Sequence, residues 1–293
     1  MAGPRAPAYT EYKEIRVEII PLEARYEELY CSCLEDWSRE MREAGAGDLK
    51  RRWLERNKAR GLRVLLARDE DGAIVGMIQY APIEYAPIEY APVEYERERA
   101  PVHGADLYYI YCIWVHGHDQ GVGNRQGRGI GTRLLVAAET DVRDLGAKGM
   151  VAWGLRIPVF MRSRWFKKHG YRRVDTDGIM ELLWKRFSVD AVPPRLGRLR
   201  RCPDTAPGVV TVTCLRNGWC PSVNLTAERM KRVAREFAER VNYVEIDTDN
   251  RRSFEEWGAS DQIFIDGTPL RAGPPRTYEQ LRKQVARRVR ALR

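Results

Sequence analysis

The chain has 293 residues, of which 44% are hydrophobic and 31% charged, a composition typical of a soluble globular protein with about two domains. No apolar run approaches the ~18 residues of a membrane helix. The first residues have no apolar core like that of a signal peptide, so we expect neither secretion nor membrane insertion. Six cysteines are too few for a disulfide scaffold, which favours a reducing compartment such as the cytoplasm.

The net charge of +9 is concentrated near one end of the sequence. Residues 1–190 carry a net charge of +1, whereas residues 191–293 carry +8, mostly in a proline- and arginine-rich stretch and the last expected helix. This distribution excludes a protein that is basic throughout, such as a ribosomal protein. The basic residues of the last helix lie around its outer face, which a solvated helix explains without nucleic acid.

A stretch without apolar periodicity divides the chain. Four prolines within residues 193–207 remove hydrogen-bond donors and exclude a helix there. We therefore predict a first domain over residues 1–187, a linker over 188–208 that can still pack as an ordered strap, and a second domain over 209–293.

The first domain reads as mixed α and β, because alternating apolar stretches are interspersed with stretches of helical period. Asp71-Gly72, between two short apolar runs, predicts a hairpin turn, since both residues tolerate positive φ. The expected elements are strand 15–20, a helical stretch 21–37, helix 48–59, strands 64–67 and 74–78, strand 107–115, helix 129–145, strand 149–153, helix 163–168, and strands near 173 and over 180–184.

A five-residue motif, Ala-Pro-Ile/Val-Glu-Tyr, occurs three times over residues 81–95. A proline at every fifth position prevents strand pairing, so this segment is expected to be extended and at the surface. Two interpretations stay open. The tyrosines and glutamates form a rim for a cationic substrate, or duplication has lengthened a tolerant loop, which is the simpler reading.

The second domain reads as alternating strands and helices. Thr226 fits the N-cap of a helix whose apolar residues recur at helical spacing. The expected elements are strand 209–214, a helix from 226, strand 243–246, helix 252–257, strand 262–265, and a last helix after Pro275. A span of about 100 residues can bury a core of its own, so an independent domain is expected.

The most specific motif is the glycine-rich segment Gln126-Gly-Arg-Gly-Ile-Gly-Thr132, between strand 107–115 and helix 129–145. Glycines let backbone N–H groups approach a ligand closely, and a helix N-terminus favours negative charge, so the segment fits a pyrophosphate. It lacks the Gly-Lys-Ser/Thr of a P-loop. It also follows a hairpin instead of opening a parallel βαβ unit, which argues against a dinucleotide fingerprint.

In these residues the chain resembles the GNAT superfamily of acetyl-CoA-dependent N-acetyltransferases. Gln126, Gly129 and Gly131 match the family's Arg/Gln-x-x-Gly-x-Gly/Ala loop, and residues 107–115 resemble its central strand. Residues 165–171, Trp-Phe-Lys-Lys-His-Gly-Tyr, resemble the family's later helix end. The resemblance covers roughly residues 12–187 and implies an α/β (α+β) fold of the acyl-CoA N-acyltransferase type.

The same resemblance implies acetyl-CoA as co-substrate. No cysteine-histidine spacing reaches a zinc signature, so no metal is expected. The backbone near Trp114 and Val115 would bind the pantetheine arm and polarise the acetyl carbonyl. The reaction would be direct attack of a neutral amine on the thioester, which requires a base, an oxyanion donor and an acid for the thiolate. The residues expected around the pyrophosphate are Gln126, Gly127, Arg128, Gly129, Ile130, Gly131 and Thr132.

The catalytic groups depart from the family's pattern. Many members place the thiolate's acid on a tyrosine where this chain has Phe166, so that role moves or is lost, and Ser163 is a neighbouring candidate donor. Additional residues before the glycine-rich segment include His116 and His118. His116 is a candidate base, because an unperturbed imidazole has a pKa of ~6.5. A solvated loop is the simpler alternative, and two histidines alone supply too few ligands for a metal.

A cysteine precedes the first helix of the second domain. Cys220 lies ahead of a helix N-terminus, where backbone N–H groups stabilise a thiolate and lower its pKa. The order of elements, with Trp219-Cys220 and the later Ile263-Phe-Ile-Asp-Gly267, resembles a thioredoxin-like fold. The whole chain resembles acetyltransferases with a C-terminal YoaP-like domain.

This domain also departs from the thioredoxin pattern. Val223 occupies the place of a resolving cysteine, and the proline before the later strand is replaced near Asp261, so a dithiol cycle is not expected. Three interpretations stay open for Cys220: a monothiol site that binds a thiol-containing substrate, a switch with Cys214, or an inert cysteine that packs on the first domain. Cys112, inside the central strand, is expected to pack.

We therefore expect a cytoplasmic N-acetyltransferase that moves an acetyl group from acetyl-CoA to the amine of a small molecule or peptide. Its thioredoxin-like domain would bind substrate or a thiol. The alternative is an acyl-CoA-binding, thiol-sensing protein without turnover, and an RNA-associated protein is the weakest of the three classes. Neither a membrane nor a nucleic acid is expected as a partner, and the sequence leaves the oligomeric state open.

Overall fold

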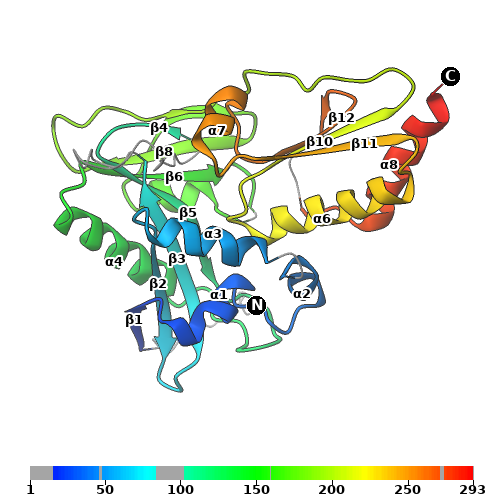
Figure 1. Cartoon of the computed structure of the whole chain (residues 1–293). Helices are drawn as coiled ribbons and strands as arrows, with labels where there is room; N and C mark the ends of the chain where they lie inside the picture. The colour runs from blue at the N-terminus through cyan, green and yellow to red at the C-terminus, as the bar shows by residue number, and fades with distance from the viewer. Residues whose placement is uncertain (1–15, 46–47, 84–101, 159, 271–273, 293) are drawn as a thin grey trace, which may run out of the picture.

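The computed structural model describes residues 16–45, 48–83, 102–158, 160–270 and 274–292, which form two main sheets with helices packed on them (Figure 1). The first sheet has seven strands in the order β1-β2-β3-β5-β6-β8-β7. The strands are β1 (Val17–Pro21), β2 (Arg63–Asp69), β3 (Ile74–Pro82), β5 (Leu107–Val115), β6 (Gly149–Leu155), β7 (Arg172–Asp177) and β8 (Met180–Arg186). All neighbours in this sheet are antiparallel except β5 and β6, which are parallel.

Helices cover both faces of the first sheet. On one face, α1 (Glu27–Cys31) and α3 (Leu49–Lys58) bury Tyr30 and Trp53 against the strands, and the short turn η1 (Ala24–Tyr26) and α2 (Arg39–Gly45) lie beside them in the chain. On the other face pack α4 (Ile130–Asp144) and α5 (Ser163–Lys168). Apart from Glu139, the buried residues of α4 are apolar and recur at helical spacing, which is why this segment folds as an amphipathic helix: Ile130, Leu134, Leu135, Ala138 and Val142.

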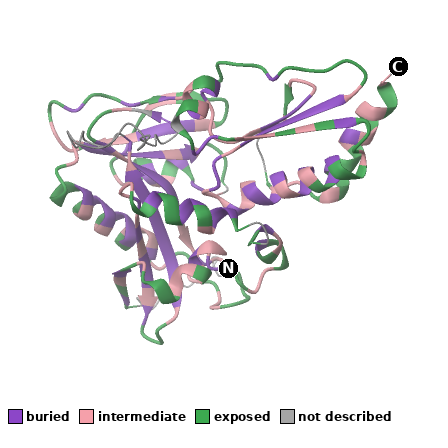
Figure 2. Ribbon diagram, viewed as in Figure 1, coloured by how far each residue is buried: buried purple, intermediate pink, exposed green. Residues whose placement is uncertain are grey.

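The second sheet has four strands in the order β11-β10-β12-β13. The central strand β10 (Val210–Arg216) is parallel to β11 (Val241–Asp247) and antiparallel to β12 (Gln262–Ile265), which pairs with β13 (Thr268–Pro269). Helices α6 (Pro221–Glu236) and α8 (Tyr278–Ala291) bury an apolar core on one face, and α7 (Arg251–Trp257) places Trp257 against Phe264 on the other. Figure 2 shows that the buried positions follow the strands of both sheets and the inward faces of the helices.

Residues 188–208 are an ordered strap between the two sheets. Within them β9 (Arg195–Leu196) pairs with β4 (Val102–His103). Arg198 pairs with Asp175 of the first sheet at 2.6 Å, and Arg201 pairs with Glu256 of α7. The positive charge of the strap is therefore partly matched by carboxylates of β7 and α7.

The predicted turns and helix starts are confirmed only in part. The hairpin at Asp71-Gly72 is confirmed, with Gly72 at φ +83° between the paired strands β2 and β3. The helix start expected at Thr226 is wrong: α6 begins at Pro221, since proline is favoured in the first turn of a helix. The five-residue repeat lies almost wholly outside the described residues. Within the described residues, no helix has the length and apolarity needed to cross a bilayer.

Candidate active site

The central feature of the first sheet is a fork between its two parallel strands. The paired residues of β5 and β6 run only from Leu107 with Gly149 to Ile110 with Ala152, although both strands continue beyond this ladder. Trp153 of β6 donates its indole N–H to the Tyr111 carbonyl over 2.8 Å, which closes the vertex of the fork with a side chain. Beyond this hydrogen bond β5 and β6 are no longer paired with each other.

A β-bulge at the same point changes which side chains face the cleft. Residues Gln79 and Tyr80 of β3 face Cys112 and Ile110 of β5, so Tyr111 is the extra residue. Tyr111 and Cys112 both belong to the core on the α1 and α3 side, instead of alternating between faces. Bulges of this kind re-aim side chains and occur often beside active sites.

The glycine-rich segment lies beside the fork, at the N-terminus of α4. Gly127 and Gly129 have φ of +75° and +77°, a region in which glycine has no steric penalty, and Gly129 is the N-cap residue. The first N–H groups of a helix have no partner within the helix and attract anions. The local geometry is therefore suited to a pyrophosphate.

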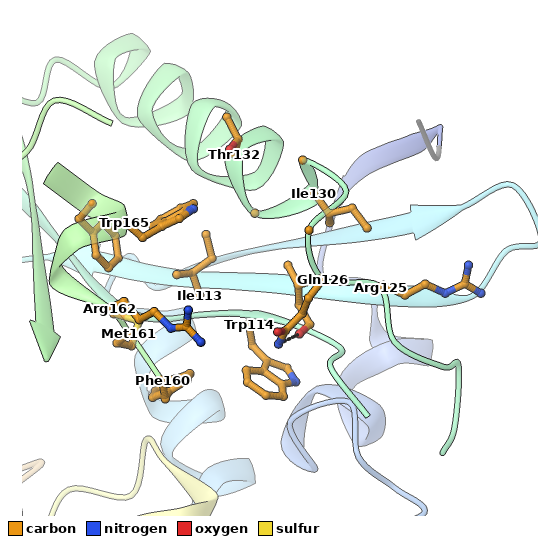
Figure 3. Close-up of a pocket in the computed structure, with 15 residues that line it drawn as sticks. Ile113, Trp114, Arg125, Gln126, Ile130, Thr132, Phe160, Met161, Arg162 and Trp165 are labelled. Carbon is orange, nitrogen blue, oxygen red and sulfur yellow. Dashed lines mark hydrogen bonds between the residues drawn. The ribbon is translucent and has the colours of Figure 1, made fainter. Parts of the chain in front are cut away.

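The end of β5, beyond its ladder with β6, and the glycine-rich segment line one pocket of about 660 Å³ (Figure 3). Its wall includes every residue expected to bind the cofactor except Arg128, and it also contains residues that were not expected. Figure 3 shows Trp165 and Thr132 on one side of β5 and Trp114 and Phe160 on the other, so the pocket passes from one face of the sheet to the other. The lining residues are Ile113, Trp114, Val115, Arg125, Gln126, Gly127, Gly129, Ile130, Gly131, Thr132, Phe160, Met161, Arg162, Trp165 and Phe166.

Two side chains fix the end of β5 and the first turn of α4. Gln126 donates from Nε2 to the Val115 carbonyl over 3.1 Å, so this carbonyl already has a partner. His169 bridges α5 and α4: its Nδ1 lies 2.8 Å from the Trp165 carbonyl and its Nε2 lies 2.9 Å from the Thr132 hydroxyl. Because a carbonyl only accepts, Nδ1 carries a proton, and in the neutral ring Nε2 accepts from the Thr132 hydroxyl. The sequence shows His169 only as one position of the aromatic-rich helix end.

His116, the candidate base, is buried and both of its ring nitrogens have partners. Its ring is fully buried, Nδ1 lies 2.9 Å from the Gly123 carbonyl, and Nε2 accepts from Trp37 Nε1 over 3.2 Å. An indole N–H can only donate and a carbonyl can only accept, so both ring nitrogens are engaged and the tautomer is fixed. A ring in this state has no free lone pair for the proton of an amine.

His118, two residues further along the same loop, has a partly exposed ring. Its side chain is 43% exposed, and its Nε2 lies 3.2 Å from Oε1 of Glu35, whose side chain is 15% exposed. Its ring centroid lies 6.0 Å from that of Trp114, a wall residue of the pocket. Burial raises the pKa of Glu35 above its ordinary value, although His118 and His116 oppose this shift. The sequence does not distinguish His116 from His118. The fold does, because it buries the first ring and leaves the second partly exposed.

Ser163 is not among the residues that line the pocket. It is 3% exposed in the first turn of α5, and its hydroxyl is hydrogen-bonded to the buried carboxylate of Glu181. Burial alone would raise the pKa of Glu181, but Lys167 and Ser163 outweigh it and the pKa is lowered. Phe166, by contrast, lines the pocket with a ring that has no proton to donate.

Cys220 does not have the activated environment that the sequence suggested. It is the N-cap residue of α6, and its thiol receives hydrogen bonds from the backbone of Ser222 and Val223. Burial against the first domain, near Cys33, nevertheless raises its pKa to about 12. Burial also raises the pKa of Cys214 to about 12, and Cys214 packs in the core of the second sheet instead of facing Cys220. The structure thus counts against an activated Cys220 thiolate.

Cys112 is buried in the core under α1 and α3, as expected for a packing residue. Across the described part of the chain, no group of three or more His, Cys, Asp or Glu side chains is arranged to hold a metal ion.

Comparison with known proteins places the first domain in a family. The model of the acetyltransferase (GNAT) family matches residues 22–171, which is just over half of the chain. No curated protein matches. Similar solved structures include the PaiA N-acetyltransferase of Thermoplasma acidophilum in complex with coenzyme A, with 17% identity, TM-score 0.41, and coverage of 59% of this chain and 100% of that one. Another is a GNAT family acetyltransferase of Brucella melitensis in complex with acetyl-CoA, with 17% identity, TM-score 0.36, and coverage of 61% and 92%. On the family match, the chain belongs to the GNAT family of acetyltransferases.

Proposed function

We propose that the protein transfers an acetyl group from acetyl-CoA to the nitrogen of an amine, by direct attack of the amine on the thioester. One observation carries this proposal: the end of β5, beyond its ladder with β6, lines the same pocket as the glycine-rich N-terminus of α4. One end of this pocket suits a pyrophosphate and the other passes through the sheet, as a long acyl carrier requires.

Different residues of the pocket would bind the pyrophosphate and the pantetheine arm of acetyl-CoA. The N–H groups from Gly127 to Thr132 would hold the pyrophosphate, and Arg162 adds positive charge to the wall. The pantetheine arm would follow β5 past Ile113 toward Trp114. The indole N–H of Trp114 is buried and has no hydrogen-bond partner among the described residues. A carbonyl oxygen of the bound thioester or of the arm would satisfy this donor.

We assign the role of general base to His118, oriented by Glu35. The amine must lose a proton as its nitrogen bonds to the acetyl carbon, and a half-exposed imidazole beside Trp114 is placed to take it. The C–S bond then breaks and coenzyme A leaves as a thiolate. With Phe166 at the position of the family's tyrosine acid, the thiolate takes its proton from protonated His118 or from solvent.

For the second domain we propose a thioredoxin-like fold of the YoaP-like type. The sheet order β11-β10-β12-β13, with one parallel pair beside two antiparallel pairs, supports this proposal, as does the loop with Trp219 and Cys220 ahead of α6. The division into domains at 1–187, 188–208 and 209–293 is part of the same proposal. All six cysteines are free thiols, which supports a reducing, cytoplasmic location.

The alternative function is binding of acyl-CoA without turnover, coupled to thiol sensing. The ring at Phe166 favours it, because the usual acid is missing. The raised pKa of Cys220 counts against the sensing half, since a thiol sensor needs an accessible thiolate.

The test separates the two functions. The purified protein is titrated with acetyl-CoA by calorimetry and then incubated with acetyl-CoA and four amines: phenethylamine, 2-cyclohexylethylamine, spermidine and a lysine-containing peptide. Mass spectrometry should detect an N-acetylated amine with one equivalent of coenzyme A released. Tight binding of acetyl-CoA with no amide from any of the four amines would favour the binding protein.

A further inference from the structure

The loop between β10 and α6 brings a tryptophan of the second domain to the fork of the first. The Trp219 ring centroid lies 5.7 Å from that of Tyr111 and 6.3 Å from that of Trp153, the two residues whose hydrogen bond closes the vertex of the fork. Trp219 therefore lies on the α1 and α3 side of the sheet, where the pocket emerges.

A continuous row of aromatic rings connects this tryptophan with the pocket. Trp153 lies 5.8 Å from Phe160, and Phe160 lies 5.8 Å from Trp114, measured between ring centroids. Phe160 and Trp114 line the pocket (Figure 3). Trp219, Trp153, Phe160 and Trp114 are each only half-buried, so their rings keep surface that the protein itself does not cover.

A hydrogen bond to Asp261 fixes the orientation of the Trp219 ring. Its indole N–H donates to Oδ2 of Asp261 over 3.0 Å, and Oδ1 of the same carboxylate accepts from the backbone of Asn217 over 3.1 Å. A Cβ added to Gly218, at φ +107°, would lie 3.4 Å from the Leu49 carbonyl and from Trp53 Cβ, so the loop is seated directly on α3. The tryptophan thus stands on a rigid support.

Ion pairs on either side of this loop hold the second domain against the first. At one end, Arg229 of α6 is 6% exposed and makes two hydrogen bonds to Glu43 of α2, of 2.7 and 3.2 Å. At the other end, Arg56 of α3 lies 2.6 Å from the buried carboxylate of Asp249. One partner of each pair, Arg229 or Asp249, is buried, and charge-assisted hydrogen bonds are sensitive to geometry, so the two ends fix the position of the loop between them.

We infer that the second domain completes the acceptor site: Trp219, with Trp153, Phe160 and Trp114, forms an aromatic wall along which an amine with a flat, apolar body reaches the thioester. This inference rests on the proposed acetyl transfer. The rings determine the class of acceptor, because planar groups stack on aromatic side chains and an ammonium group is attracted to their faces. None of the four rings carries a charge to pair with a second cationic group, so a polyamine is the poorer fit.

The experiment uses the full-length protein, acetyl-CoA and three amines: phenethylamine, its non-planar counterpart 2-cyclohexylethylamine, and spermidine. Wild-type kcat/KM should be highest for phenethylamine. In Trp219→Ala, KM for phenethylamine should rise roughly tenfold or more, with KM for acetyl-CoA changed less than about twofold. Trp219→Phe keeps a ring and should restore most of the loss.

Tyr278→Ala is the matched control, since it removes a half-buried aromatic ring from the same domain at the start of α8. It should leave both KM values as in the wild type, with melting curves showing that both alanine variants are folded. An unchanged KM for phenethylamine in folded Trp219→Ala overturns the composite site, and a wild-type preference for spermidine overturns the aromatic class. Failure of the proposed acetyl transfer shows separately, as absence of any amide from the wild type.

Discussion

His118 Nε2 lies 3.2 Å from Glu35 Oε1, and this pair joins the loop after β5 to the segment between α1 and α2. Trp37 holds the same loop at a second point, through its hydrogen bond to His116. One histidine of the loop therefore anchors it while the other presents a partly exposed ring beside Trp114. The assignment of a base depends on this difference, which two neighbouring positions in the sequence do not reveal.

Replacement of His118 by glutamine should lower kcat roughly 100-fold, the usual contribution of a general base. The wild-type rate should fall as the pH is lowered, because a protonated imidazole cannot accept a proton, and this acid limb should flatten in His118→Gln. Glu35→Gln should give a smaller loss. Asp119→Asn, an exposed change in the same loop, is the control and should match the wild type. A wild-type pH profile in His118→Gln would exclude this base.

Glu43→Gln should destabilise the protein by about 2 kcal/mol, because it leaves the buried Arg229 guanidinium without its main partner. Glu40→Gln removes a 60% exposed carboxylate 3.4 Å from the same arginine, and should change the stability by less than about 0.5 kcal/mol. Urea unfolding at pH 7 measures both variants. Equal effects would show that the Glu43 contact does not hold the domains together.

The same pair predicts a pH dependence of stability. The hydrogen bond from Arg229 is the main reason that the pKa of Glu43 is lowered. A lowered folded-state pKa means that the stabilisation is present above the ordinary carboxyl value of about 4.3 and is lost as the pH falls through the lowered pKa. The wild-type urea midpoint should therefore drop more steeply below pH ~4.5 than that of Glu43→Gln. Parallel curves for the two proteins would contradict the assignment.

Alkylation should distinguish the cysteines. Burial raises the pKa of Cys214 and Cys220 to about 12, so few of these thiols are ionised at pH 8, whereas Cys202 is exposed in the strap. Iodoacetamide at pH 8 should modify Cys202 first, and the other two only after unfolding, as judged by peptide mass spectrometry. Rapid labelling of Cys220 in the folded protein would instead restore the reactive-thiol interpretation.

Gly129→Glu should weaken binding of acetyl-CoA roughly 30-fold or more, since the new carboxylate faces the site of the pyrophosphate. Gly146→Glu is the matched control at the other end of α4. Both glycines have positive φ, +77° and +82°, and both have open space where a Cβ would be added, so the backbone strain is similar. Calorimetry should find wild-type affinity in Gly146→Glu. If both variants lost the same affinity for acetyl-CoA, the cause would be backbone strain and not the charge at the pocket.

Local patterns explain how much of the fold the sequence predicted. The hairpin at Asp71-Gly72, the strand over 107–115 and the helix from the glycine-rich segment depend on turn chemistry and periodicity within short windows. The start of α6 differs from the expected one. Thr226 is a good capping residue, but Pro221 in the first turn determines the observed start. The glycine-rich wall of the pocket was predicted for the same local reason.

The remaining features depend on contacts between distant segments. The engagement of His116 Nε2 depends on Trp37, 79 residues earlier in the chain. The pKa of Cys220 is set by burial against the first domain, which outweighs the helix N-terminus. Trp219 reaches Tyr111 only because the domains are docked, so no periodicity in the sequence could place it at the fork.

A crystal structure of the dead-end complex with coenzyme A and phenethylamine tests the central claim most directly. We predict the pyrophosphate on the N–H groups from Gly127 to Thr132, the thiol at the fork between β5 and β6, and the amine's ring against Trp219. Coenzyme A bound away from the fork, or an amine that reaches the thiol without contacting the second domain, would contradict this account.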